Sequence, residues 1–334
     1  MNICIIKLGA DGDVLRTLPL AQALFKKTNA NITWITRGDV ATLLEGLPYI
    51  HSILQSSDVA TMPYVEFDAL YNFDTELEAC TSAQKITAKK KYGFYDDGGY
   101  PAAFNAGAEY YLNTMFDDML KKENGKTYQE MMFEVAELPY AEEGYSFALT
   151  NEEKLAAQTL LQEKTSPEKK LIGIHLGASS RWPSKAWNKE NVKAFIALVK
   201  AKGHDVLLFG GPNEIASHAQ LINELKEKDM QVIQNNPHNT KRAFAALVEL
   251  CDVLVCADSF ALHVALGVGT KTIALFFVTS PAEVEEYGLL TKLIAPRLNE
   301  FFPERSDQYD EALTKSISAE EVLIAVEEAL SINP

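Results

Sequence analysis

Two aspartates near the start of the chain are candidates for proton transfer. Asp11 and Asp13 lie in the stretch GADGDVLR, where an apolar strand gives way to a helix. A carboxylate at such a turn can take a proton from a hydroxyl group in a cleft. Turn and capping chemistry is the alternative reason for an aspartate at these two positions. Gly9 and Gly12 are three positions apart and the loop is acidic, which disfavours the G-x-G-x-x-G dinucleotide fingerprint.

A second stretch, HLGASSRWPSKAW, has the residue types that bind phosphate. Small residues allow backbone N–H groups to approach phosphate oxygens, and nearby cations can neutralise them. The second glycine of a Walker A loop is missing, and a plain turn with surface cations is the alternative. The candidate phosphate ligands in this stretch are Ser179, Ser180, Arg181 and Lys185.

Two further turns carry candidate ligands. Glu214 follows FGG, where a carboxylate can accept from both hydroxyls of a ribose or can simply favour a helix start. In CADSFALH, Ser259 and His263 lie one helical turn apart on the same face, next to Asp258. Together they could hold a phosphate at the helix N-terminus. The alternative is that Asp258 caps the helix and His263 belongs to the core.

All of these residues follow segments that read as strands. The first forty residues read as strand, helix and strand, and from residue 171 onward strands and helices alternate regularly. This alternation predicts doubly wound α/β domains, in which ligands bind at the carboxyl ends of the strands. The capping box from Ser280 to Glu283 predicts one more helix start.

A chain of 334 residues exceeds one ordinary core, so we expect two domains. Residues 1–150 form the expected first domain and residues 151–317 the second, with a polar helix near 151 at the boundary. A last helix over 318–334, which opens with a capping box, is expected to pack back on the first domain.

Charge and cysteine usage exclude several function classes. The net charge of −15 argues against broad binding to nucleic acid or to an anionic membrane. The 4 cysteines have no metal-ligand spacing, so we expect buried thiols and no metal site. The N-terminal apolar run is unlike a secretory signal, which predicts a cytoplasmic protein. Arg16, Arg37 and Lys85 are the candidate contacts for an anionic acceptor.

Taken together, and in their order along the chain, these turns resemble those of glycosyltransferase family 9, the heptosyltransferases that build the inner core of bacterial lipopolysaccharide. The stretches that carry the resemblance are KLGADGDVLRTLPLAQAL, HLGASSRWPSKAWNKENVKAFI, LLFGGPNE and VCADSFALHVALGVGTKTIALFFVTSP. The resemblance implies a GT-B fold, in which two Rossmann-like doubly wound domains face a cleft. The first domain would bind the acceptor and the second the donor.

The resemblance also implies an activity. It implies inverting transfer of a heptose from ADP-heptose to a saccharide or lipid-linked saccharide acceptor, with no obligatory metal. Contact with the inner face of the inner membrane would be peripheral at most. By position, the general base is Asp13, the donor phosphate ligand is Lys185, the ribose contact is Glu214, and the diphosphate-binding turn after Asp258 includes Ser259 and His263.

The chain departs from the family pattern in its second half. Phe260 follows the Asp-Ser pair where the family usually has glycine, and Phe277 and Val278 stand where it usually has Gly-Pro. A bulky Phe260 could block the approach to phosphate or could stack on a base or a sugar. Two alternatives therefore stay open. One is a nucleotide-sugar-binding scaffold without efficient transfer, and the other is a GT-B-like epimerase using His175 or His263.

Overall fold

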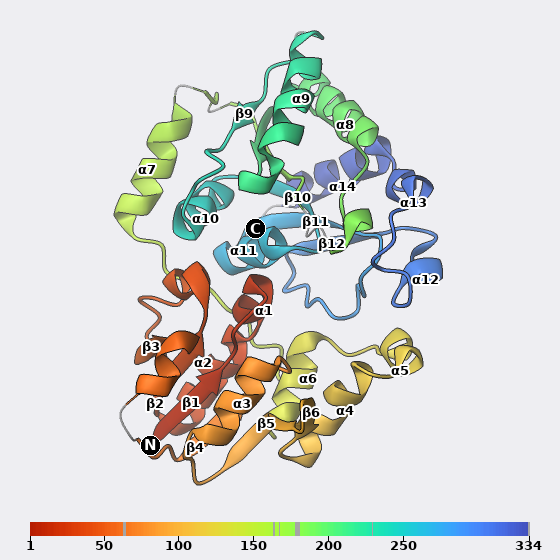
Figure 1. The fold of residues 1–334 in the computed structure, drawn as a ribbon. Helices are drawn as coiled ribbons and strands as arrows, with labels where there is room; N and C mark the ends of the chain where they lie inside the picture. The colour runs from red at the N-terminus through yellow and green to blue at the C-terminus, as the bar shows by residue number, and fades with distance from the viewer. Residues whose placement is uncertain (63–64, 163, 167, 178–180, 229, 333–334) are drawn as a thin grey trace. The chain divides into compact units, whose positions relative to one another are not determined.

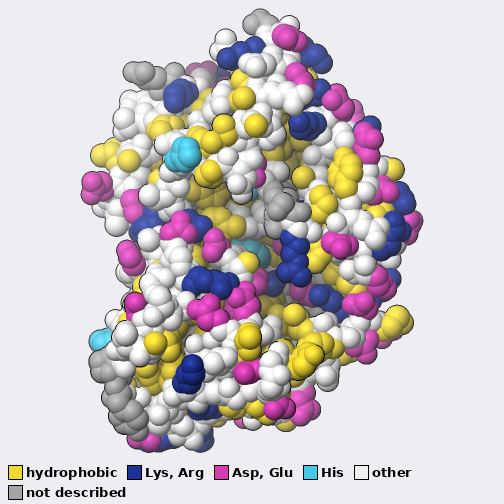
Figure 2. All heavy atoms as spheres, viewed as in Figure 1, with side chains coloured by type: hydrophobic (Ala, Val, Ile, Leu, Met, Phe, Trp, Pro, Cys, Tyr) yellow, Lys and Arg dark blue, Asp and Glu magenta, His cyan; other side chains and the backbone are white. Residues whose placement is uncertain are grey.

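The computed structural model describes residues 1–62, 65–162, 164–166, 168–177, 181–228 and 230–332. The chain divides into two compact units, each an α/β sheet with its own helices (Figure 1). Unit 1 consists of Met1–Ala148 and Ala282–Glu285, and unit 2 of Leu149–Pro281 and Glu286–Pro334. The short return of residues 282–285 to unit 1 was not expected from the sequence. On the face seen in Figure 2, acidic and basic side chains are interspersed.

The described residues of unit 1 form a sheet of six strands in the order β3-β2-β1-β4-β5-β6. Its neighbouring strands are parallel except for β5 and β6, which pair antiparallel. This is the doubly wound order, and it reverses between β1 and β4, where a ligand crevice is expected. The strands are β1 (Asn2–Ile6), β2 (Asn31–Thr36), β3 (Ser52–Gln55), β4 (Ala69–Asn72), β5 (Lys91–Asp97) and β6 (Tyr100–Ala103).

Two helices of unit 1 begin at side-chain caps. Thr127 and Glu130 form the expected capping box of α6, and the Asp117 side chain caps α5. The helices of this unit are α1 (Asp11–Arg16), α2 (Leu18–Thr28), α3 (Leu77–Lys85), α4 (Glu109–Thr114), α5 (Asp118–Glu123) and α6 (Tyr128–Val135).

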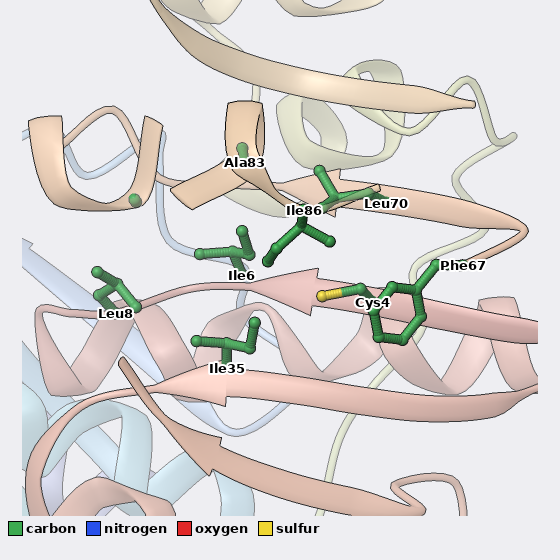
Figure 3. Packing of buried hydrophobic residues seen from close by; sticks show 9 residues of the cluster. Cys4, Ile6, Leu8, Ile35, Phe67, Leu70, Ala83 and Ile86 are labelled. Atoms are coloured by element: carbon green, nitrogen blue, oxygen red, sulfur yellow. The ribbon is translucent and has the colours of Figure 1, made fainter. Parts of the chain in front are cut away.

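The core of unit 1 lies on both sides of β1, which is buried from Ile3 to Ile6 because it is a central parallel strand. Figure 3 shows Cys4 and Ile6 beside Leu70 of β4 and Ile86, the residue after α3. Each fully buried side chain of this size contributes roughly 1.5–3 kcal/mol to the free energy of unfolding. All four cysteines are buried free thiols, including Cys80, which does not lie in an apolar stretch of the sequence.

Unit 2 repeats the same topology. Among its described residues, the strand order is β12-β11-β10-β7-β8-β9 and every neighbouring pair is parallel. The order reverses between β7 and β10, which places the second expected crevice there. The strands are β7 (Leu171–His175), β8 (Asp205–Phe209), β9 (Ile233–Gln234), β10 (Val253–Ala257), β11 (Lys271–Phe276) and β12 (Leu290–Ile294).

The last helix, α14, belongs to unit 2, whereas the sequence analysis expected it on the first domain. Its buried stripe, which includes Val322 and Val326, packs against α8 and β11. A stripe at this spacing shows that a helix face is buried but not which sheet covers it. The helices of unit 2 are α7 (Asn151–Gln162), α8 (Lys189–Ala201), α9 (Ile215–Lys226), α10 (Lys241–Glu249), α11 (Phe260–Val268), α12 (Leu298–Phe301), α13 (Glu311–Lys315) and α14 (Ala319–Ser331).

One glycine in the sheet of unit 1 gives a direct test of the fold. Gly93 has a φ of +91°, and a Cβ atom added there would lie 1.8 Å from the Asn72 carbonyl oxygen. We expect Gly93→Ala to lower the free energy of unfolding by about 3 kcal/mol or more, because backbone strain and a backbone clash add. Chemical denaturation measures this loss.

The matched control is Gly99→Ala. Gly99 has a φ of +96° but nothing within 4 Å of an added Cβ atom, so only strain remains. We expect a loss of about 1 kcal/mol. Equal losses in the two variants would contradict the close approach of β5 to β4.

Candidate functional site

Unit 1 has a buried lysine at its switch point, the place where the strand order reverses between β1 and β4. Lys7 directly follows β1 and is 3% exposed. Its Nζ lies 3.6 Å from Asp74 Oδ2 and 3.8 Å from Asp13 Oδ2, and it donates to the Phe73 carbonyl oxygen at 3.3 Å. Burial alone would lower the pKa of Lys7, but Tyr128, Asp74 and Asp13 together raise it above its ordinary value. The ammonium is therefore charged at neutral pH.

Asp74 fixes the loops after β1 and β4 to one another. Its Oδ2 accepts from the backbone N–H of Leu8 at 3.0 Å and of Gly9 at 3.4 Å, and its Oδ1 accepts from the N–H of Glu76 at 3.1 Å. A buried carboxylate satisfied by several N–H groups and a cation is a stable anchor. The loop before α1 is therefore held in one place.

Asp13 lies in the first turn of α1 between two cations. Arg16 Nη2 is 2.9 Å from Asp13 Oδ1, and Lys7 approaches the other oxygen. The Asp13 side chain keeps 31% of its surface exposed, so a substrate can reach it. Neighbouring cations stabilise the ionised form of a carboxylate, which is the form that accepts a proton.

Tyr128 supports this arrangement from α6. Its ring is buried, and the Arg16 guanidinium stacks over it with the Cζ atom 3.8 Å from the ring centroid. Its hydroxyl lies 3.1 Å from the Thr17 hydroxyl. Arg16 is thereby oriented toward Asp13, while burial and the nearby acids act on its pKa in opposite directions and leave it raised. Lys7, Asp74 and Tyr128 are site residues that were not expected from the sequence.

The other two acceptor candidates lie at different edges of the sheet. Arg37 follows β2, and its guanidinium pairs with Glu76 at 2.8 Å and with Glu78 at 3.4 Å, beside the Gly9 loop. Lys85 ends α3, which runs back toward the amino end of β5. It therefore lies at the opposite edge from Asp13, and the structure does not bring it into this cluster.

In unit 2, Asp258 joins the loop after β7 to the start of α11. Lys185 Nζ donates to the Asp258 carbonyl oxygen at 2.7 Å and lies 3.3 Å from Asp258 Oδ2. His263 Nε2 is 4.0 Å from Asp258 Oδ1. The expected donor residues Lys185, Asp258 and His263 thus form one cluster. Ser259, rather than Asp258, is the N-cap of α11, and its buried Oγ has no hydrogen-bond partner among the described residues.

Glu214 lies at the carboxyl end of β8, in a short 3₁₀ turn over Pro212–Glu214. Its Oε2 accepts from the Gly211 N–H at 2.8 Å. Gly177 allows Glu214 and His175 to approach, because a Cβ atom there would lie 3.1 Å from Glu214 Cδ and 2.9 Å from His175 Cε1. Burial, with a contribution from His218, lowers the pKa of His175 to about 4, so its imidazole is neutral.

Part of the expected phosphate loop is not placed. Ser179 and Ser180 lie outside the described residues. Arg181 is described, and its Cζ atom lies 4.9 Å from the Trp182 ring centroid. Within the described ranges, no group of three or more His, Cys, Asp or Glu residues could hold a metal ion.

Asp74→Asn tests whether the buried carboxylate holds the two loops. An amide would place an NH₂ group against a backbone N–H, so we expect the free energy of unfolding to fall by about 1–3 kcal/mol. Urea denaturation measures this fall. The control is Asp68→Asn, which removes a more exposed carboxylate that accepts from the Asn2 N–H and from Lys89. Its expected loss is about 1 kcal/mol or less, and a loss equal to that of Asp74→Asn would refute the anchoring role.

Known proteins share sequence and fold with this chain. The model of glycosyltransferase family 9 (heptosyltransferase) matches residues 61–308. A curated relative, lipooligosaccharide heptosyltransferase 2 of Campylobacter jejuni, is 28% identical over 116 residues, which are 32% of this chain. The matched segment spans about a third (34%) of the length of that relative.

Two solved structures have this fold over nearly the full chain. One is the glycosyl transferase family 9 protein of Veillonella parvula, with a TM-score of 0.77, 18% identity, and coverage of 98% of this chain and 97% of that chain. The other is the ADP-heptose lipopolysaccharide heptosyltransferase II of Escherichia coli, with a TM-score of 0.73, 18% identity, and coverage of 99% and 98%. The fold is GT-B, with two Rossmann-like units. From the match of its family model to most of the sequence, the chain belongs to glycosyltransferase family 9, the heptosyltransferase family.

Proposed function

We propose that this protein is an inverting glycosyltransferase that moves a heptose from ADP-heptose to a saccharide acceptor of the lipopolysaccharide inner core. Family membership supports transfer over the scaffold and epimerase alternatives. The E. coli structure with this fold is named for ADP-heptose and lipopolysaccharide. The observation that carries the proposal is Asp13, a partly exposed carboxylate held between Lys7 and Arg16 at a switch point of the sheet.

In the proposed reaction, Asp13 is the general base. Its carboxylate takes the proton of an acceptor hydroxyl as that oxygen bonds to the anomeric carbon of the donor sugar. The bond from that carbon to the diphosphate breaks, and the leaving diphosphate takes the electron pair. One displacement at one carbon inverts its configuration. Lys7 and Arg16 position the carboxylate and keep it ionised before the proton arrives.

The donor contacts are proposed in unit 2. Lys185, the start of α11 and the Ser259 hydroxyl would bind the diphosphate, because cations and N–H groups stabilise the charge that develops on it. Glu214 would accept from the ribose hydroxyls, with His263 beside the diphosphate. Ser179, Ser180 and Arg181 remain proposed phosphate contacts. These cations and N–H groups would themselves balance the negative charge of the diphosphate, so we propose that no metal is obligatory.

The acceptor contacts are proposed in unit 1. Arg16 and Arg37 are the proposed contacts for an anionic acceptor. The position of Lys85, at the opposite edge of the sheet from Asp13, does not support a role for Lys85 as an acceptor contact. None of the helices in the described part of the chain is long and apolar enough to span a membrane. We propose that the protein acts in the cytoplasm and meets a lipid-linked acceptor by peripheral contact only.

Asp13→Asn tests the catalytic assignment. The amide keeps the shape of the side chain but cannot take the proton, so we expect kcat to fall by about 10²–10⁴-fold. The affinity for ADP is expected to stay the same, because the donor contacts lie in unit 2. Release of ADP from ADP-heptose in the presence of acceptor measures the rate, and calorimetry measures ADP affinity.

The matched control is Asp11→Asn, in the same turn of α1. Its turnover is expected to stay within a few-fold of the unaltered protein. Ala10 rather than Asp11 is the N-cap of α1, and the helix dipole favours an acid such as Asp11 in the first turn. Wild-type turnover in Asp13→Asn would rule out Asp13 as the base. An equal loss in both variants would attribute the effect to the turn rather than to one carboxylate.

A further inference from the structure

The bulky residue at the start of α11 packs toward α10. The Phe260 ring lies 5.9 Å from the Phe244 ring, centroid to centroid, with the two planes 27° apart. Phe244 comes from α10 and is buried. An offset stack of this kind fixes the direction of both rings. Phe260 is the first residue of α11, and the stack holds its ring in one orientation.

Phe244 is itself fixed by two edge contacts. Its ring makes T-shaped contacts with Phe209 at 5.2 Å and with His175 at 5.8 Å. Phe209 and His175 are the last residues of β8 and β7, two neighbouring central strands. Through the ring contacts of Phe244, Phe260 is thus connected to the carboxyl ends of β7 and β8, the strands that the candidate donor residues follow.

A lysine ammonium lies over the Phe260 ring. Lys241 is the first residue of α10, and its Nζ lies 4.8 Å from the centroid of the Phe260 ring. This is within the distance at which a ring attracts a cation. The ring therefore holds a positive charge close to the first turn of α11.

The same turn has features that suit an anion. The Ser259 Oγ is buried there without a hydrogen-bond partner in the described part of the chain. Asp258 pairs with Lys185 at 3.3 Å, and Lys241 contacts the Phe260 ring. Ser259 is the N-cap of the nine-residue helix α11, and Phe260, whose ring Lys241 contacts, is the first residue of that helix.

We propose that Lys241 contacts the diphosphate of the nucleotide donor and that Phe260 is the residue that positions it. This inference rests on the proposed function and adds a contact where the chain departs from the family pattern. A lysine carries its charge on a compact ammonium group at the end of a flexible side chain. This group can stay close to the diphosphate as negative charge develops on the diphosphate. The glycine usual at this position leaves room for phosphate, whereas Phe260 would hold a cation beside it.

The test compares ADP with adenosine, which lacks the diphosphate, by calorimetry on the full chain. We expect Lys241→Met to weaken ADP binding by about tenfold and to leave adenosine binding unchanged, because only the phosphate contact is lost. Lys241→Arg should restore most of the affinity, since it keeps a cation over the ring. The control is Lys189→Met, an exposed lysine of α8, which should change neither affinity.

Phe260→Leu tests the positioning role. It keeps an apolar contact with Phe244 but removes the ring, so ADP affinity should fall in the same direction by a few-fold. In the double variant, the loss should equal that of Lys241→Met alone, because the ring acts through the lysine.

Other outcomes separate the alternatives. Wild-type ADP affinity in Lys241→Met would overturn the inference and leave the proposed function standing. An equal loss for adenosine would assign Lys241 to the nucleoside and also overturn it. Tighter ADP binding in Phe260→Leu would show that the ring blocks the phosphate site. If the unaltered protein binds no ADP, the proposed function fails together with the inference.

Discussion

The buried ion pair between Lys7 and Asp74 is the contact on which unit 1 depends. A lysine with 3% exposure is stable as an ammonium only beside negative charge, and two carboxylates supply it. Asp74 also binds the N–H groups that precede α1, so one contact fixes both loops of the switch point. The orientation of Asp13 follows from it, with Arg16 and Tyr128 closing the other side.

The two units apply the same sheet topology to different chemistry. Each sheet has the doubly wound order and each places its candidate residues at the reversal of that order. In unit 1 the candidate reactive group is a carboxylate, and two cations contact it. In unit 2 an acid, Asp258, orients a cation, Lys185, toward a helix N-terminus. These are the two kinds of group that the proposed reaction needs, because a carboxylate can accept a proton and a cation can stabilise a leaving anion.

Local patterns predicted much of this arrangement, and long-range contacts explain the rest. Alternating strands and helices indicated both sheets, so Asp13, Glu214 and Asp258 could be placed at strand ends. Lys7 and Asp74 escaped notice because they are 67 positions apart and meet only through the pairing of β1 with β4. The helix expected from Ser280 does not form, since Glu283 returns to unit 1 and accepts from the Tyr128 N–H at 3.0 Å.

The central claim is that Asp13 accepts the proton and that its neighbouring cations keep it ionised. The most direct measurement is the pH dependence of kcat/KM for the unaltered protein and for Arg16→Gln. The Arg16 guanidinium lies 2.9 Å from the Asp13 carboxylate and favours its ionised form. Removal of the guanidinium should therefore move the acid limb of the profile to higher pH. An acid limb that stays at the same pH in a variant that still turns over would contradict the account.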